Sequence, residues 1–433
     1  MRVALLYPEV YDMARYKEGR REFPPFGVLY LAAVIREAGH EIEILKVTPE
    51  NTALDLRVFD AVGFSLASSA TYGFMLEARN KSKFKEGVLI LVGGVHCNFY
   101  PEMSIADFRA DIASYGESEE TILEMLERAG SGWFGGIKGT VWKNDGKLIR
   151  EAPVKINRDI DWLPLPARHL LPRTDFLLND RLAGTDTLMA HTMFSRGCPF
   201  PCAFCAAGDS VMQYRSGSSA RLELEHLKAE YGIGGFAIVD DNFIVNRRKV
   251  VEVCKSIEDL GLVWSALSRV DTVNEEVVHH MARAGCIEIK FGMESGSEQL
   301  LTAMRKNTTQ AKIRHAIDMA SNAGIKAKVF IIHGYPGENM ETTLETMHFL
   351  EELGSRISRV SLFRFVPLPG TQVYSQPGIR GTHLRSDWDR NWSKFHIHHN
   401  PLQWWGDEKD WIELEQGYEL LRSFVEANWN AQG

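Results

Sequence analysis

Three cysteines, Cys198, Cys202 and Cys205, form a C-x3-C-x2-C motif, the arrangement in this sequence best suited to chemistry. They follow the apolar segment 189–195, which has the pattern of a buried strand, so they fall on the loop after it. Three closely spaced thiolates can ligate three irons of a [4Fe–4S] cluster and leave the fourth iron open. The alternative, zinc, needs a fourth ligand, usually from a second C-x2-C or a histidine pair, and none stands nearby. The motif therefore predicts a [4Fe–4S] cluster.

The remaining cysteines, Cys97, Cys254 and Cys286, are scattered along strand-like or helix-like segments. Six cysteines in 433 residues are too few for a disulfide framework, and the grouping of three suits metal binding in a reducing compartment. We therefore expect a cytoplasmic protein in which these other three thiols serve packing.

The composition favours a small-molecule enzyme. The formal net charge is −8, with 24% charged and 45% hydrophobic residues. A nucleic-acid surface would require a basic stripe, which this balance argues against. No segment approaches the roughly 20 apolar residues that cross a membrane, and the apolar run at residues 3–7 is too short for a signal peptide. We therefore expect neither a nucleic-acid nor a membrane partner.

From residue 188 onward, strand-like and helix-like segments alternate six times. The expected strands are 189–195, 236–239, 263–267, 287–291, 326–332 and 360–365, and the expected helices are 220–231, 248–260, 275–284, 309–323 and 342–353, with a short one at 298–304. Several helices follow a capping residue and stop at a glycine. Six such units predict an open barrel, smaller than the eight-unit form, with its active site at the carboxyl ends of the strands.

Residues before the barrel also alternate strand and helix, which predicts a parallel, doubly wound sheet. We expect four regions: a Rossmann-like domain at 1–135, a hairpin and proline-rich linker at 136–185, the barrel at 186–372, and a tail at 373–433. The tail holds six of the ten tryptophans and the histidines His396, His398 and His399. This composition favours an aromatic plug or a helical lid that shields the barrel mouth.

The cysteine motif and the strand ends together resemble the radical S-adenosylmethionine (SAM) superfamily over about residues 188–371. Segments at the strand ends (240–243, 268–269, 292–296, 334–338 and 367–371) resemble the branch of that family that carries a cobalamin-binding domain. This resemblance implies that SAM chelates the open iron. It also implies that Phe204 packs against the adenine, that Arg269 pairs with the SAM carboxylate, and that Ser268, Glu294 and Ser295 bind the ribose or the amino group. Arg269 in a structural ion pair and Glu294 as a strand-end cap are the alternatives.

Residues 1–130 resemble the cobalamin-binding domain of that branch. Ser65, Gly93 and Gly94 are small residues at strand ends, where the backbone can approach a bulky ligand. Two departures leave cobalamin binding open. The D-x-H-x-x-G motif, whose histidine ligates cobalt, is absent, with His96 as a remote substitute. The link from Val47 to Asp60 is also too short for the usual helix.

Two reactions follow from the resemblance. The whole chain resembles the radical SAM dehydratase that deoxygenates paromamine in apramycin biosynthesis, which implies dehydration of a 1,2-diol in an aminoglycoside-type substrate of antibiotic biosynthesis. The alternative is cobalamin-dependent C-methylation of an unactivated carbon; tRNA methylthiotransferase activity would need a basic RNA module. Either main reaction needs an external electron donor of the flavodoxin or ferredoxin type.

Dehydration would also need an acid or base beside the reacting carbon. Tyr214, Asp241 and Glu338 are the candidates for that catalytic role. Asp240 and Asp241 could equally tie a loop to the next helix.

Overall fold

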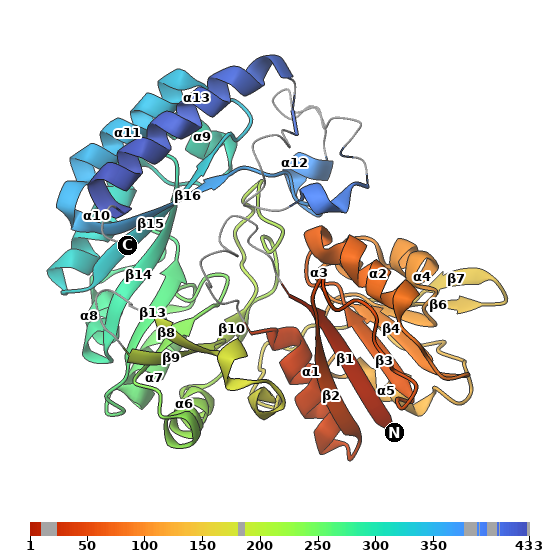
Figure 1. Cartoon of the computed structure of the whole chain (residues 1–433). Helices are drawn as coiled ribbons and strands as arrows, with labels where there is room; N and C mark the ends of the chain where they lie inside the picture. The colour runs from red at the N-terminus through yellow and green to blue at the C-terminus, as the bar shows by residue number, and fades with distance from the viewer. Residues whose placement is uncertain are drawn as a thin grey trace. The chain divides into compact units, whose positions relative to one another are not determined.

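The computed structural model describes residues 1–9, 24–180, 187–375, 388, 390–395, 405–406 and 408–430 (Figure 1). The chain divides into two compact units. Unit 1 comprises Met1–Asn157, Trp162–Phe176 and the tail segment Arg390–His396, and unit 2 comprises Arg158–Asp161, Leu177–Asp389 and Ile397–Gly433. The histidine cluster proposed for the tail lies outside the described residues. None of the described helices is long and apolar enough to span a bilayer.

Unit 1 is built on one mixed sheet of strand order β2-β1-β3-β4-β5-β6-β7. Its parallel strands are β1 (Arg2–Pro8), β2 (Glu41–Val47), β3 (Ala61–Ser65), β4 (Leu89–Gly93) and β5 (Ile112–Ser114); β6 (Thr140–Asn144) and β7 (Lys147–Arg150) form the expected hairpin. The helices are α1 (Phe26–Glu37), α2 (Tyr72–Lys81), α3 (Val95–Phe99), α4 (Pro101–Phe108) and α5 (Thr121–Glu127). The central strands β1, β3 and β4 are almost continuously apolar and buried, as parallel strands covered on both faces must be, whereas the edge strand β2 is partly exposed.

The order of these strands reverses at β1, because β2 lies on one side of it and β3 on the other. In open parallel sheets, ligands bind beyond the carboxyl ends of the strands at such a reversal. The segment between β2 and β3 has no helix in the described structure, as its shortness predicted. The short helices α3 and α4 were not expected, and they place residues directly after β4 at this edge of the sheet.

Unit 2 contains the predicted open barrel. Its sheet order is β16-β15-β14-β13-β12-β9-β8. The parallel strands among the described residues are β9 (Thr187–Thr192), β12 (Gly235–Ile238), β13 (Val263–Ser268), β14 (Cys286–Glu294), β15 (Lys326–His333) and β16 (Ile357–Arg364). An unexpected strand, β8 (Leu177–Asp180), pairs antiparallel with β9 and extends the sheet. The α/β fold class is thus confirmed.

Helices cover the outer face of this sheet. They are α6 (Gly217–Tyr231), α7 (Arg247–Ile257), α8 (Glu275–Arg283), α9 (Glu298–Ala303), α10 (Gln310–Asn322) and α11 (Met340–Leu353), followed by α12 (Gln372–Ser375) and α13 (Glu408–Val425). Five of them begin at a polar side chain that accepts a backbone N–H of the first turn: Ser216, Asn246, Asn274, Thr309 and Asn339. These caps fix where each helix begins after its strand.

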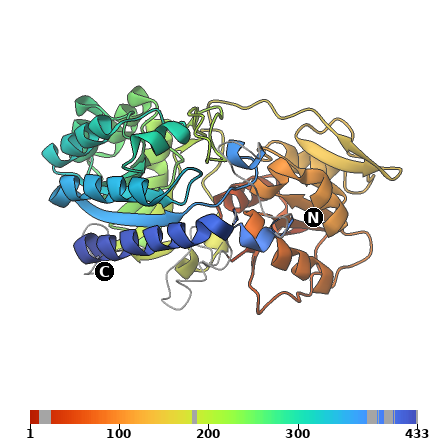
Figure 2. The ribbon, with the colours of Figure 1, turned by 90° about the horizontal axis from the view of Figure 1, so that it is seen from above.

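The tail helix α13 belongs to the barrel unit and packs against α11 and β16. Figure 2 shows it, in dark blue, running alongside the lighter blue helix and strand. Arg364 at the end of β16 forms a bidentate ion pair with Glu415, and its guanidinium stacks 3.6 Å from the Tyr418 ring centre. Gly417 lies so close to β15 and α11 that a Cβ there would be 3.1 Å from Nε2 of His333. The helix therefore packs beside α11 and β16, where the helix of a sixth strand–helix unit would lie.

Candidate functional site

The segment that leads into the cysteine loop is anchored by the two aspartates after β12. Asp240 accepts the Phe194 N–H at 2.8 Å and the Ser195 hydroxyl at 2.6 Å. Asp241 accepts the Gly197 N–H at 3.3 Å. Burial raises the pKa of Asp240 to about 7 and also raises that of Asp241. Both carboxyls therefore position the cysteine loop, a structural role with a different partner from the next helix that was considered for them.

The loop itself folds back on a short two-stranded ladder. Gly197 has φ +85°, and a Cβ there would lie 2.5 Å from the Val211 carbonyl oxygen, so only glycine fits. The Ser210 hydroxyl accepts the Cys198 N–H at 2.8 Å. Tyr214, a predicted catalytic residue, lies in this ladder on β11 (Gln213–Tyr214), which pairs with β10 (Ser195–Arg196). Burial raises the pKa of Tyr214.

The three cysteine thiols are neighbours on one loop, and each is within electrostatic reach of the others. Burial raises the pKa of the Cys205 thiol to about 11, and it also raises that of Cys198. Thiolate is the form that binds iron, and a bound cation would reverse this burial effect. No three His, Cys, Asp or Glu side chains of the described chain converge on a single metal-ion position. The donor set itself, three thiols on an anchored loop, fits a [4Fe–4S] cluster.

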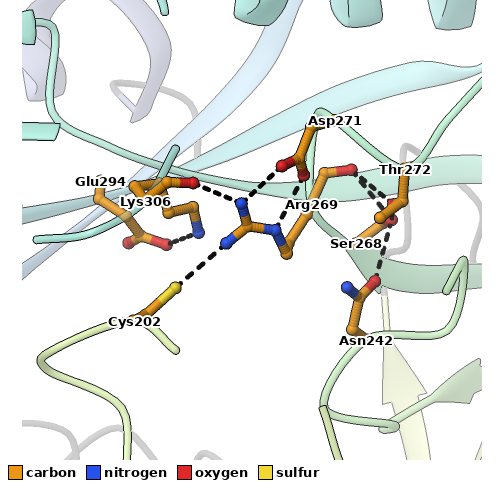
Figure 3. A network of polar contacts seen from close by, with 8 residues as sticks. All are labelled: Cys202, Asn242, Ser268, Arg269, Asp271, Thr272, Glu294 and Lys306. Carbon is orange, nitrogen blue, oxygen red and sulfur yellow. Dashed lines mark hydrogen bonds and ion pairs between the residues drawn. The ribbon is translucent and has the colours of Figure 1, made fainter. Parts of the chain in front are cut away.

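Arg269 is the main cation beside this loop (Figure 3). Its Nη1 donates to Cys202 Sγ at 3.1 Å, and its guanidinium lies 4.1 Å from the ring centre of Phe200. Asp271 holds the other edge of the guanidinium through two hydrogen bonds, at 2.8 and 2.6 Å, and Nη2 also donates to the Lys306 carbonyl. The structure thus places Arg269 both in a structural ion pair and at the cysteines.

Glu294 ends β14 and pairs with a lysine that sequence reasoning missed. Its carboxylate accepts a hydrogen bond from Lys306 Nζ at 2.7 Å, and the two side chains are 9% and 5% exposed. A Cβ on Gly292 would lie 2.5 Å from this carboxylate. Glu294 also has φ +69°, which is uncommon for a residue other than glycine. Lys306 Nζ lies 5.8 Å from the ring centre of Phe204, so the pair borders the predicted adenine-binding residue.

The two predicted serines are engaged in buried hydrogen bonds. Ser268 donates to Asn242 Oδ1 at 3.3 Å and lies 3.0 Å from the Thr272 hydroxyl. The Ser295 hydroxyl lies 3.2 Å from that of Thr346 on α11. Both serines lie at strand ends next to the site. Ser268 hydrogen-bonds to the loops after β12 and β13, and Ser295 to α11.

Glu338 follows β15 and caps the segment that leads into α11. Its carboxyl accepts the Thr342 hydroxyl at 2.7 Å and the Gly334 N–H at 3.3 Å. Burial raises its pKa to about 7, so this group can exchange a proton near neutral pH.

In unit 1, the residues predicted to approach cobalamin lie at the carboxyl ends of β3, which borders the strand-order reversal at β1, and of β4, the next strand. Ser65 ends β3 and Gly93 ends β4, and the two are paired in register. A Cβ on Gly93 would meet the Ser114 hydroxyl at 2.7 Å, and one on Gly94 (φ +97°) would meet the Leu66 carbonyl at 2.9 Å. The glycines therefore allow the loops after β3 and β4 to approach each other closely, which fits the edge of a ligand cradle.

His96, directly after this glycine pair, is fully buried. Its Nδ1 lies 2.9 Å from the Ser69 hydroxyl, while its Nε2 has no hydrogen-bond partner among the described residues. Burial lowers its pKa to about 4, so the imidazole is neutral. Buried polar atoms usually have a hydrogen-bond partner, so the unpaired Nε2 of His96, beside the residues predicted to approach cobalamin, suits contact with a bound ligand.

Sequence profiles of two families match this chain. The profile described as the Radical SAM superfamily matches residues 192–350, and the B12 binding domain matches residues 18–126. An uncharacterized methyltransferase of Pyrococcus horikoshii is 30% identical over 379 residues, covering 84% of this chain and 81% of that protein. An anaerobic magnesium-protoporphyrin IX monomethyl ester cyclase of Rubrivivax gelatinosus is 24% identical over 401 residues, covering 87% and 70%.

A solved structure shares the fold. It is a radical S-adenosylmethionine methyltransferase of Kitasatospora setae with cobalamin and a [4Fe–4S] cluster bound, and it superposes with a TM-score of 0.65 at 17% identity over 88% of this chain and 74% of that one. The identity and coverage of the Pyrococcus relative, together with the two profiles, decide the family. The chain belongs to the radical SAM superfamily, in the group that carries a B12-binding domain ahead of the barrel, and this membership implies a [4Fe–4S] cluster and SAM.

Proposed function

We propose that this chain is a cobalamin-dependent radical SAM enzyme that transfers a methyl group to an unactivated carbon of a small molecule. The observation that carries the proposal is the pairing of two features in one chain. A three-cysteine loop follows the first parallel strand of an open barrel, and a glycine pair lies at the carboxyl edge of a B12-type sheet, one strand beyond β3 and the strand-order reversal. The names of the Pyrococcus relative and the Kitasatospora structure support methyl transfer.

In unit 2, Cys198, Cys202 and Cys205 would hold the cluster, and Arg269 would balance its charge while pairing with the SAM carboxylate. When bound, the cluster supplies the electron that cleaves the sulfonium of SAM into methionine and an adenosyl radical. Phe204 would pack against the adenine. The buried Glu294 and Lys306 would fix the shape of the pocket wall beside it.

In unit 1, Ser65, Gly93 and Gly94 would let the backbone approach the cofactor. When bound, cobalamin supplies the methyl group that the substrate carbon gains. The hydrogen removed from that carbon leaves as part of 5′-deoxyadenosine, and an external flavodoxin- or ferredoxin-type donor supplies the electron for SAM cleavage. The balance would require a second SAM, whose methyl group replaces the one transferred and which leaves as S-adenosylhomocysteine, and a second electron from the same external donor; no protein nucleophile would be needed.

Dehydration of a 1,2-diol remains a second candidate. The lack of a helix between β2 and β3 in the described structure gives unit 1 a reduced cofactor edge, which suits a reaction without cobalamin. Tyr214, Asp241 and Glu338 stay the proposed acid and base residues for it, with Glu338 titrating nearest to neutral pH. The relatives described above give the apramycin dehydratase no specific support, so methyl transfer leads.

The products of SAM separate the two reactions. After anaerobic reconstitution with iron and sulfide, the protein is reduced with SAM in the presence and absence of hydroxocobalamin. Methyl transfer to an unactivated carbon would give both S-adenosylhomocysteine, from the SAM that donates its methyl group, and 5′-deoxyadenosine, from the SAM that abstracts hydrogen, whereas dehydration would give 5′-deoxyadenosine without S-adenosylhomocysteine. We expect S-adenosylhomocysteine to form only when cobalamin is added. If 5′-deoxyadenosine forms and cobalamin changes neither product, the methyl-transfer proposal is wrong.

A further inference from the structure

One tryptophan of the tail packs into unit 1, far along the chain from the residues it contacts. Trp392 begins the short helical turn η9 (Trp392–Lys394), which packs against η2 (Ser69–Thr71) and α2. Its indole is 6% exposed, and its ring centre lies 4.9 Å from that of His96 and 5.0 Å from that of Tyr100. Residues 390–395 therefore form part of the compact core of unit 1.

The indole fills a slot at the proposed cobalamin edge. The slot is formed by segments that directly follow β3 and β4, and the His96 N–H donates to the Leu66 carbonyl at 3.1 Å to join them. Tyr72 forms a further wall, with its ring centre 6.4 Å from that of Trp392. Gly94, which allows these two segments to meet, lies two residues before His96.

The walls of this slot suit a flat, bicyclic heteroaromatic ring. Four aromatic rings contact the indole at edge-to-face or tilted angles between 44° and 78°: Tyr72, His96 and Tyr100 of the slot, and Phe395 of the tail segment itself. The fully buried His96 adds a neutral imidazole whose Nε2 has no hydrogen-bond partner in the described chain. The slot thus combines aromatic walls with one unused polar atom, which is the usual composition of a small-molecule site.

We propose that Trp392 occupies the place into which the nucleotide base of a corrinoid would insert, so that the base and the indole exclude each other. This inference rests on the proposed function. Cobalamin carries dimethylbenzimidazole, a flat bicyclic heteroaromatic of about the size of indole. Cobinamide is the same corrin ring without the nucleotide. Trp392 is then a specificity-determining residue: it lowers the affinity for cobalamin, whose binding the proposed function still requires, and leaves the affinity for a base-free corrinoid unchanged.

The test compares two corrinoids on full-length apo protein. Binding of hydroxocobalamin and of dicyanocobinamide is measured by equilibrium dialysis and absorbance for the wild type, Trp392→Ala, Trp392→Phe and Trp133→Ala. Trp133 is a matched control because it lies in the same unit and is 55% exposed. We expect Trp392→Ala to bind cobalamin about tenfold more tightly than the wild type, since several aromatic contacts no longer compete. The affinity for cobinamide should be equal in all four proteins. The affinity of Trp392→Phe for cobalamin should lie between those of the wild type and Trp392→Ala.

A second measurement needs no variant and so does not depend on how well Trp392→Ala folds. Saturating hydroxocobalamin should increase amide hydrogen exchange in residues 390–395 of the wild type, and cobinamide should not. Equal cobalamin affinity in wild type and Trp392→Ala, with unchanged exchange, would overturn the inference and leave the proposed function standing. A parallel loss of both corrinoids in the variant would overturn it as well, because Trp392 would then be part of the fold alone. If no variant binds either corrinoid, the inference and the cobalamin part of the proposed function both fail.

Discussion

Lys306 and Glu294 bring an ion pair into the interior of unit 2, next to the cysteine loop. Their side chains are 5% and 9% exposed, so neither charge is well solvated when its partner is removed. Breaking one side of such a pair costs about 3–5 kcal/mol, because the remaining charge stays buried. We therefore expect Lys306→Met to lower the free energy of unfolding by that amount, measured by urea denaturation of the apo protein.

Two comparisons qualify that result. Lys249→Met removes a solvent-exposed pair with Glu252 and should change stability by less than about 1 kcal/mol. The double variant Lys306→Met/Glu294→Leu replaces both charges and should recover much of the loss. If Lys306→Met were no less stable than Lys249→Met, the pair would not be buried as described.

Glu338 gives the fold a pH dependence of known sign. Burial raises its folded pKa from 4.5 to about 7. Between these values the folded state holds a proton that the unfolded state has released, so stability is full below about pH 4.5 and declines as the pH rises to about 7. One such group contributes a slope of at most about 1.4 kcal/mol per pH unit. Subtracting the curve of Glu338→Gln from that of the wild type, by thermal unfolding from pH 5 to 7, should isolate a negative slope; a flat difference would contradict this reading.

The cysteine loop and its partners show which residue roles can be inferred from sequence. The spacing of Cys198, Cys202 and Cys205 is local, so it identifies a cluster motif directly. The role of Lys306 was missed because no sequence pattern indicates its ion pair with Glu294. That contact depends on the path of the chain from the end of β14 through α9 to Lys306. Trp392 was singled out only by composition, since its contacts with His96 and Tyr100 depend on the tertiary fold.

At the scale of elements, α13 packs closely against α11 and β15 at Gly417. Gly417 faces Thr343 Oγ1 and His333 Nε2, at 3.0 and 3.1 Å from where its Cβ would be. A branched side chain there would force α13 away from α11 and β15, which costs about 1–3 kcal/mol in a packed contact. We expect Gly417→Val to lower the unfolding temperature by several degrees and to raise amide exchange in α13, relative to Ser423→Val.

Ser423 is exposed on the same helix, so its variant places valine on α13 without the contact. Helix propensity works against the expected loss, because valine replaces the poorer helix former glycine at 417 and a residue of similar propensity at 423. Equal melting temperatures for the two variants would show that α13 does not dock through Gly417.

The repeating elements of the barrel were predictable, and the exceptions have physical causes. The strands that became β12, β13, β15 and β16 are apolar runs between helices with side-chain caps, so periodicity and capping both identify them. The strand β8 escaped prediction because four residues carry too little pattern, and it forms by pairing with β9. The short helix α3 follows Gly94 and α4 begins at Pro101, and glycine and proline in isolation indicate turns.

For the whole molecule, the sequence alone predicted two regions, a parallel sheet before the proline-rich linker and an open barrel after it. The two family profiles match these two regions. The expected diol dehydration was the weaker part of the prediction, because reaction type depends on the cofactor of unit 1 and on the substrate. Neither is encoded in a short motif. The tail was expected to act as a plug or a lid for the barrel, yet its described residues include one segment in unit 1 and one helix in unit 2.

The central claim is that the three-cysteine loop holds a [4Fe–4S] cluster that cleaves SAM. The most direct measurement reconstitutes the wild type, the alanine variants of Cys198, Cys202 and Cys205, and Cys254→Ala, a buried cysteine on α7, under anaerobic conditions. Iron content, visible absorbance and 5′-deoxyadenosine formation from SAM are then recorded together. We predict that each loop variant loses the cluster absorbance and the 5′-deoxyadenosine, and that Cys254→Ala keeps both. A loop variant that keeps both, or a wild type that binds iron and leaves SAM intact under reduction, would contradict the account.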